Sequence, residues 1–148
     1  MEESLYKRIL LIVEGGALDH AVTAAAAARA LANKARLFVL HVVDHMVINR
    51  MKRVSEQSTA EIEIELEEKG WKALYYAEEF AKDNGVATMI LQKSGIVENE
   101  VLNEAARLQV DLIILGYPRK MPGQARRLAQ GRLEKIVENA PCSVLVVK

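Results

Sequence analysis

The chain lacks a second cysteine, a net charge and any long apolar run. Its lone thiol, Cys142, excludes an internal disulfide framework and is typical of a reducing cytoplasm. Twenty basic side chains balance twenty acidic ones, so no global field attracts nucleic acid or a membrane surface, and any electrostatic function must be local. The apolar runs are short and two of the first seven residues are acidic. We therefore expect no signal peptide, no membrane insertion and a cytoplasmic location.

The composition is that of an ordinary globular domain, with 51% apolar and 27% charged residues. A chain of 148 residues can bury a substantial core, and we expect one domain over residues 1–148. Apolar runs without polar alternation predict strands that are covered on both faces and paired in parallel. Such runs lie at residues 8–14, 36–43, 86–92, 112–115 and 143–147. Together they predict an α/β fold: a three-layer, doubly wound, five-stranded parallel sheet with helices on both faces.

Four helices are expected between the strands, at residues 18–34, 55–84, 96–109 and 125–139. The second needs a decision, because residues 61–68 alternate at period two, which alone predicts a strand. However, the apolar residues of the whole segment share a helical face: Ile62, Leu66, Ala73, Tyr76, Ala77 and Phe80. We therefore predict one long helix, weakened at Gly70 and ended by Asn84 and Gly85.

The segment after the fourth predicted strand is the most informative part of the chain. The strand ends at Gly116, and five basic residues with no acidic one follow: Arg119, Lys120, Arg126, Arg127 and Arg132. Ligands of parallel α/β sheets bind at the carboxyl ends of the strands, so a basic loop there indicates an anion pocket. The alternative is a solvated basic face with exposed partners such as Glu134.

Other polar residues have structural rather than chemical interpretations. His41 and His45 flank Asp44 without sharing a helical face, so we expect a packed strand histidine at position 41 and no metal site. Cys142 has no His–Asp partner and is expected to be a small buried residue. The aromatic residues of the long helix are expected to pack rather than to stack on bases. The basic residues at 50–53 are expected to lie in a solvated loop.

Several blocks of the sequence carry a resemblance to a known family. Residues 7–14, 40–44 and 111–116 are similar to the family's first, second and fourth strands. The most specific block is 134–147, in which a helix, Ala-Pro-Cys and Val-Leu-Val-Val occur together. Over nearly all of its length the chain resembles the universal stress protein family. The resemblance implies strand order 3-2-1-4-5 and a homodimer, which we expect to form through the exposed edge of Ser143–Val147.

The family's ATP-binding members carry G-x2-G-x9-G-S/T after the fourth strand, and its glycines let backbone N–H groups approach the phosphates. In this chain Gly116 matches the first glycine and Arg119 stands in place of the second. One alignment puts Gln130 and Gly131 at the final pair with one extra residue, and another puts Gly131 and Arg132 there with two. Both alignments break the motif, although an arginine could replace the backbone cradle with a charged clamp.

In the nucleotide-binding interpretation, the resemblance implies that Glu14, in place of the family's usual Asp, and Val42 lie near the nucleoside. Residues near the phosphates would be Gly116, Arg119, Arg126, Gln130, Gly131 and Arg132. ATP or AMP is the expected ligand, and we assign no catalytic residue and no metal ligand. The expected function is a non-enzymatic binding or regulatory module of the stress response. The broken motif leaves open a ligand-free protein-interaction module, for example a transporter regulator, and a slow ATPase or nucleotide switch.

Overall fold

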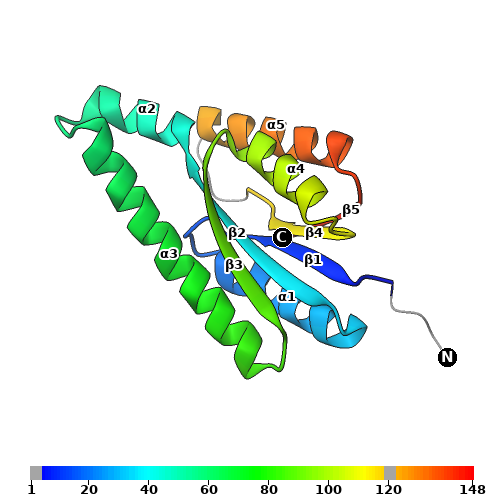
Figure 1. Cartoon of the computed structure of the whole chain (residues 1–148). Helices are drawn as coiled ribbons and strands as arrows, with labels where there is room; N and C mark the ends of the chain where they lie inside the picture. Colours follow the sequence, from blue (N-terminus) through cyan, green and yellow to red (C-terminus); the bar gives the residue numbers. More distant parts are fainter. Residues whose placement is uncertain (1–4, 119–122) are drawn as a thin grey trace.

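A computed structural model describes residues 5–118 and 123–148 of the chain as one parallel sheet between two layers of helices (Figure 1). The sheet contains β1 (Arg8–Ile12), β2 (Arg36–Asp44), β3 (Thr88–Gly95), β4 (Leu112–Gly116) and β5 (Ser143–Val147). All four strand pairings are parallel, and the order is β3-β2-β1-β4-β5. The expected fold class and strand order are confirmed.

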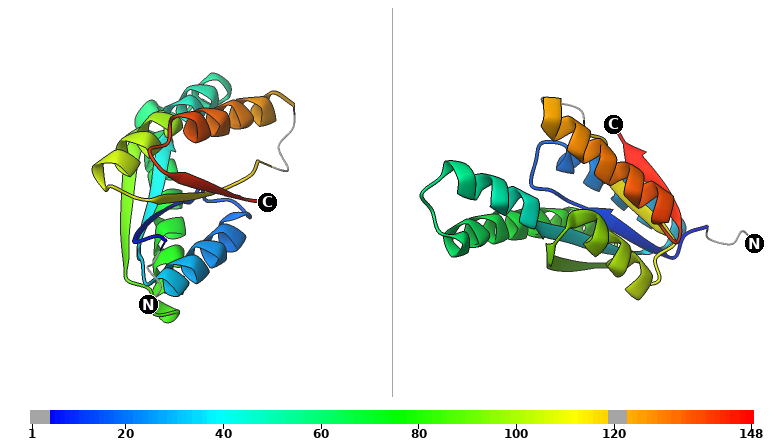
Figure 2. Two further views of the ribbon diagram at one scale, coloured as in Figure 1. Left: turned by 90° about the vertical axis from the view of Figure 1, so that its right-hand side faces the viewer. Right: turned by 90° about the horizontal axis from the view of Figure 1, so that it is seen from above.

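The helices divide between the two faces of the sheet. They are α1 (Asp19–Asn33), α2 (His45–Val54), α3 (Thr59–Asp83), α4 (Val97–Arg107) and α5 (Gly123–Asn139). α1 and α3 cover one face, and α4 and α5 cover the other, as the left view of Figure 2 shows. Successive strand side chains point to opposite faces, so Ile9 and Leu11 of β1 pack on the α1–α3 side while Leu10 packs on the α4–α5 side.

The expectation of a solvated loop at residues 50–53 is wrong, because these residues belong to α2. Asp44 begins this helix, since its Oδ1 accepts a hydrogen bond of 2.9 Å from the backbone N–H of Met46. Within α2 only Ile48 is buried, and it packs with Val43 and Ile62. The sequence carried a signal for this helix that the prediction overlooked, since its apolar residues recur at helical spacing: Val47, Ile48, Met51 and Val54.

The long helix α3 is confirmed as a single element of 25 residues. A capping box starts it, in which the Ser58 side chain accepts from the N–H of Glu61 and the Glu61 side chain accepts from that of Ser58. The helix continues through Gly70 without a break, so any weakening by this glycine does not interrupt the helix. Trp71 and Tyr75 stack on each other with ring centroids 5.7 Å apart and remain 36% and 57% exposed, outside the core.

His41 and Cys142, the candidates for a metal ligand and a nucleophile, both pack against the protein interior. His41 is 6% exposed within β2, which confirms a packed strand histidine. Desolvation and the nearby charge of Lys69 lower the pKa of His41. Cys142 is half-buried against the core on the α4–α5 side. Desolvation, with the charge of Asp111, raises the pKa of its thiol, so a nucleophilic thiolate is disfavoured.

Candidate functional site at the strand ends

The loop between β1 and α1 is held in shape by a carboxylate. The Asp19 side chain accepts hydrogen bonds from the backbone N–H groups of Glu14, at 2.9 Å, and Gly15, at 2.7 Å. Gly15 has φ +84°, a left-handed conformation that a residue with a Cβ adopts only with strain. Together these features place Glu14 just beyond the carboxyl end of β1, at the edge of the sheet where α/β proteins bind ligands.

Arg132 reaches this edge from α5, which covers the opposite face of the sheet from α1. Its Nη1 donates to Oδ2 of Asp44 at 3.1 Å, and its Nη2 lies 3.7 Å from Oε1 of Glu14. The Arg132 side chain is only 23% exposed. One guanidinium therefore joins the carboxylates that follow two neighbouring strands, β1 and β2. Of the predicted site residues, Glu14 and Arg132 are brought together, whereas the predicted exposed partner Glu134 has no part in these contacts.

Asp44 is a site residue that the sequence analysis missed. It lies at the carboxyl end of β2, next to the end of β1, but the sequence analysis assigned it no role in ligand binding. The available signal was an acidic residue directly after a buried strand, at the same edge of the sheet as Glu14. Lys69 of α3 was also missed, and it approaches from the opposite side of the β1–α1 loop, against Gly15.

Burial raises the pKa of two carboxyl groups at this edge, Glu14 and Asp19. Desolvation raises the pKa of Glu14, Arg132 opposes the rise, and the charges of Asp19 and Asp44 add to it. Because 60% of the Glu14 side chain is still exposed, solvent screening limits this effect. Desolvation also raises the pKa of Asp19, against the hydrogen bonds from the loop and the charge of Lys69. The site therefore combines carboxylate hydrogen-bond acceptors with the guanidinium of Arg132.

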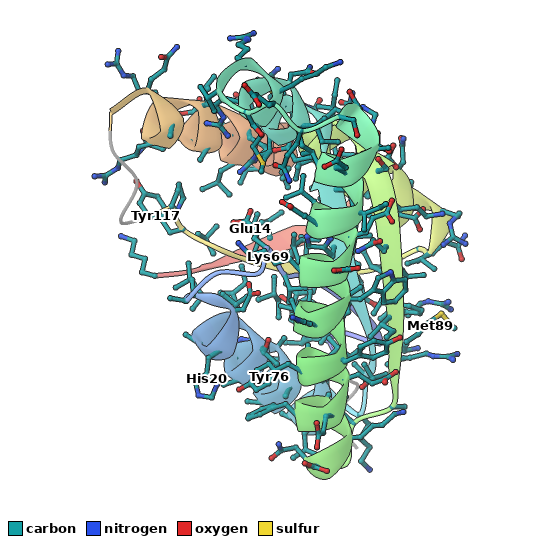
Figure 3. The ribbon with its side chains drawn as sticks, turned by 90° about the vertical axis from the view of Figure 1, so that its left-hand side faces the viewer. Glu14, His20, Lys69, Tyr76, Met89 and Tyr117 are labelled. Carbon is teal, nitrogen blue, oxygen red and sulfur yellow. The ribbon has the colours of Figure 1, made fainter. Side chains whose placement is uncertain are left out.

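A shallow cavity of about 460 Å³ opens on the α1–α3 side of the same loop. Figure 3 shows Glu14 and Lys69 close together at the upper end of this region, with His20 and Tyr76 lower down between α1 and α3. His20 Nδ1 hydrogen-bonds to the Tyr76 hydroxyl across this gap. The cavity lining includes Gly15, Gly16, Asp19, His20, Lys69 and Tyr76.

The end of β4 lies on the other side of the site. Gly116 backs onto α1, and a Cβ there would overlap the side chain of Leu18. The next residue, Tyr117, donates its backbone N–H to the carbonyl of Val147 at 2.8 Å. Its hydroxyl accepts from Nε2 of Gln130 at 3.2 Å. Gly116 therefore allows β4 to pack closely against the start of α1.

The remaining predicted residues are not gathered in the same way. Gln130 and Gly131 lie well inside α5, so their backbone N–H groups belong to the helical hydrogen-bond ladder and do not form an open cradle. Val42 is 8% exposed and packs in the core on the α4–α5 side. Arg126 is exposed on α5. Arg119, like Lys120, lies outside the described residues.

Comparison with known proteins identifies the family of this chain. The model of the universal stress protein family matches residues 5–148, so the chain belongs to that family. A universal stress protein of Methanocaldococcus jannaschii is 32% identical over 148 residues, which cover 99% of this chain and 84% of the relative. The solved structure of the universal stress protein UspA from Lactobacillus plantarum has a TM-score of 0.78 at 21% identity, with both chains fully covered.

Two further solved structures of the same fold contain adenine nucleotides. One is a universal stress protein in complex with cAMP, with a TM-score of 0.71, 18% identity and coverage of 98% of this chain and 99% of the other. The other is the universal stress protein from Archaeoglobus fulgidus in complex with dAMP, with a TM-score of 0.69, 14% identity and coverage of 97% and 99%. At 18% and 14% identity, these two structures show only that this chain has the same fold.

Membrane-spanning helices and metal-binding clusters are both absent from the described residues. Within residues 5–118 and 123–148, no helix is both long and apolar enough to span a membrane. The same described segments contain no group of three or more His, Cys, Asp or Glu side chains arranged to bind a metal ion.

Proposed function

We propose that this protein is a non-enzymatic regulatory module that binds an adenine nucleotide at the carboxyl ends of β1, β2 and β4. The observation that carries the proposal is the pairing of Arg132 with both Glu14 and Asp44 at this edge of the sheet. Nucleotide complexes of two proteins with the same fold, one with cAMP and one with dAMP, support it.

Each group in the proposed site has a distinct task. The carboxylates of Glu14 and Asp44 accept hydrogen bonds from the ribose hydroxyls, and Val42 lies behind the base. The phosphates meet side chains rather than a glycine cradle, because the backbone N–H groups of Gln130 and Gly131 are used within α5. Arg132 and Arg126 supply the positive charge. Arg119 remains a prediction from the sequence.

Isothermal titration calorimetry with AMP and ATP tests this proposal. The parent should release heat on binding, and Asp44→Asn should weaken binding about tenfold or more, since a lost hydrogen bond to a charged group costs about 1.5–3 kcal/mol. Arg127→Gln is the matched control, because Arg127 is an exposed residue of the same helix that the site does not use. Absence of heat with the parent at millimolar nucleotide would rule the proposal out.

A second candidate is a protein-interaction module without a small ligand, for example one that regulates a transporter. The specific observation in its favour is that Gly131 lies inside α5, where its backbone cannot cradle a phosphate. This candidate predicts no nucleotide in the supernatant after the purified protein is denatured, and chromatography of that supernatant separates the two candidates.

We also propose that the protein forms a homodimer through β5. This strand lies at one edge of the sheet, and its residues Ser143–Val147 are almost entirely apolar. An open apolar edge with unpaired backbone groups invites pairing with another strand. The same strand from a second molecule is the partner that symmetry supplies most simply.

A further inference from the structure

Arg132 contacts the carboxylate oxygens of Glu14 and Asp44, which in the proposed site accept hydrogen bonds from the ribose. Asp44 has committed Oδ1 to the N-terminus of α2, where it accepts from Met46 N–H. Its other oxygen, Oδ2, accepts from Arg132 at 3.1 Å. The second guanidinium nitrogen lies 3.7 Å from Oε1 of Glu14. A sugar hydroxyl that approaches these two carboxylates must therefore compete directly with the guanidinium.

Displacing Arg132 from Glu14 and Asp44 reduces the binding free energy of a ligand, unless that ligand gives the guanidinium a new partner. Its side chain is only 23% exposed, so the cation loses a charge-assisted hydrogen bond to Asp44 and an ion pair with Glu14 that water restores only in part. A nucleoside replaces Arg132 as the hydrogen-bond partner of the two carboxylates, and it has no anionic group with which the guanidinium can pair. A phosphate offers a new partner, because the arginine fork binds phosphate oxygens in a bidentate manner.

We propose that Arg132 is an exchange residue that makes this site selective for phosphorylated nucleosides over nucleosides. The inference rests on the proposed nucleotide site and adds a rule of selectivity to it. In the ligand-free protein the single positive charge of Arg132 offsets part of the negative charge of Glu14 and Asp44 and occupies the space beside them. When a nucleotide binds, the ribose takes the carboxylates and Arg132 turns to the phosphate. A nucleoside is rejected because it breaks two ion pairs and creates none.

Titration calorimetry with adenosine and AMP tests the exchange, using the parent, Arg132→Gln and the control Arg127→Gln. The parent should bind AMP at least tenfold more tightly than adenosine. In Arg132→Gln, adenosine should bind several-fold more tightly than in the parent, and AMP more weakly, so that the ratio of the two affinities falls at least tenfold. Arg127→Gln should keep both parental affinities. The opposite shifts expected for the two ligands distinguish exchange from a general loss of structure.

Arg132→Lys provides a second variant, which keeps the charge without the planar fork. Its ratio of AMP to adenosine affinity should lie between those of the parent and Arg132→Gln. If AMP binds the parent but adenosine binds Arg132→Gln no more tightly than the parent, the exchange is wrong and the nucleotide site stands. If neither ligand binds the parent or either variant at position 132, both proposals are overturned.

Discussion

The backbone of Gly70 in α3 lies directly against the imidazole of His41 in β2. A Cβ at Gly70 would overlap Nδ1 of that ring. The contact is reinforced by Gln92 of β3, whose Nε2 lies 3.3 Å from His41 Nδ1 and donates to the carbonyl of Glu67 at 3.0 Å. One helix and two strands are thus joined at a point where only glycine allows the approach.

Gly70→Ala should destabilise the fold by about 1–3 kcal/mol, since extra atoms in a filled contact force neighbouring groups to move. Gly131→Ala is the matched control, because a Cβ at this position in α5 meets nothing within 4 Å. It should be neutral or should stabilise the fold by about 0.5–1 kcal/mol through helix propensity. Urea denaturation measures both midpoints. Equal stability of the two variants would contradict the packing account.

His41 should make stability depend on pH. Its pKa in the folded protein is lowered below the ordinary value of 6.5. Above 6.5 the ring is neutral in both states and its stabilising contribution is complete. As pH falls below 6.5 the unfolded chain takes up the proton first, so the free energy of unfolding falls by up to about 1.4 kcal/mol per pH unit until the folded pKa is passed.

The variant His41→Gln should flatten that slope between pH 7.5 and 5.5 in urea titrations. His45→Gln, which removes an exposed histidine, should retain the slope because His41 is still present. If the slope survived unchanged in His41→Gln, the assignment of the pH dependence to this buried ring would have to be abandoned.

Asp19 should control the order of the β1–α1 loop. Asp19→Ala removes the acceptor of two backbone N–H groups and should cost about 1–3 kcal/mol of stability. Amide hydrogen exchange at Glu14 and Gly15 should become faster, and AMP affinity should fall because Glu14 is no longer positioned. Glu138→Ala, an exposed carboxylate change on α5, serves as the control. Unchanged exchange at Gly15 would refute the proposed role.

The homodimer should depend on the β5 edge and not on the opposite edge. Val146→Lys places a charge on β5, and sedimentation should then show a monomer at micromolar concentration. Met89→Lys is the control on the far edge strand β3, where Met89 is 39% exposed (Figure 3). This variant should remain dimeric. Circular dichroism checks that both variants fold, and a monomeric parent would remove the proposal.

Four of the five strands could be predicted from the sequence because each is largely an apolar run, and the family resemblance supplied the strand order. The end of β3 could not, because residues 93–95 lie beyond the apolar residues of that strand. The helix α2 was missed although Val47, Ile48 and Met51 recur at helical spacing in its sequence.

For the site, the family resemblance pointed to Glu14, and the basic segment together with the motif alignment pointed to Arg132. The bond between Arg132 and Asp44 joins residues 88 positions apart, and no local pattern predicts such a contact. The position of Gly131 inside a helix was, in contrast, already contained in the predicted helix at residues 125–139.

A crystal structure of the protein soaked with AMP would test the central claim most directly. The account predicts density for the ribose beside Glu14 and Asp44, with the Arg132 guanidinium turned from these carboxylates to the phosphate. AMP in the cavity between α1 and α3, with Arg132 still paired to Asp44, would contradict it.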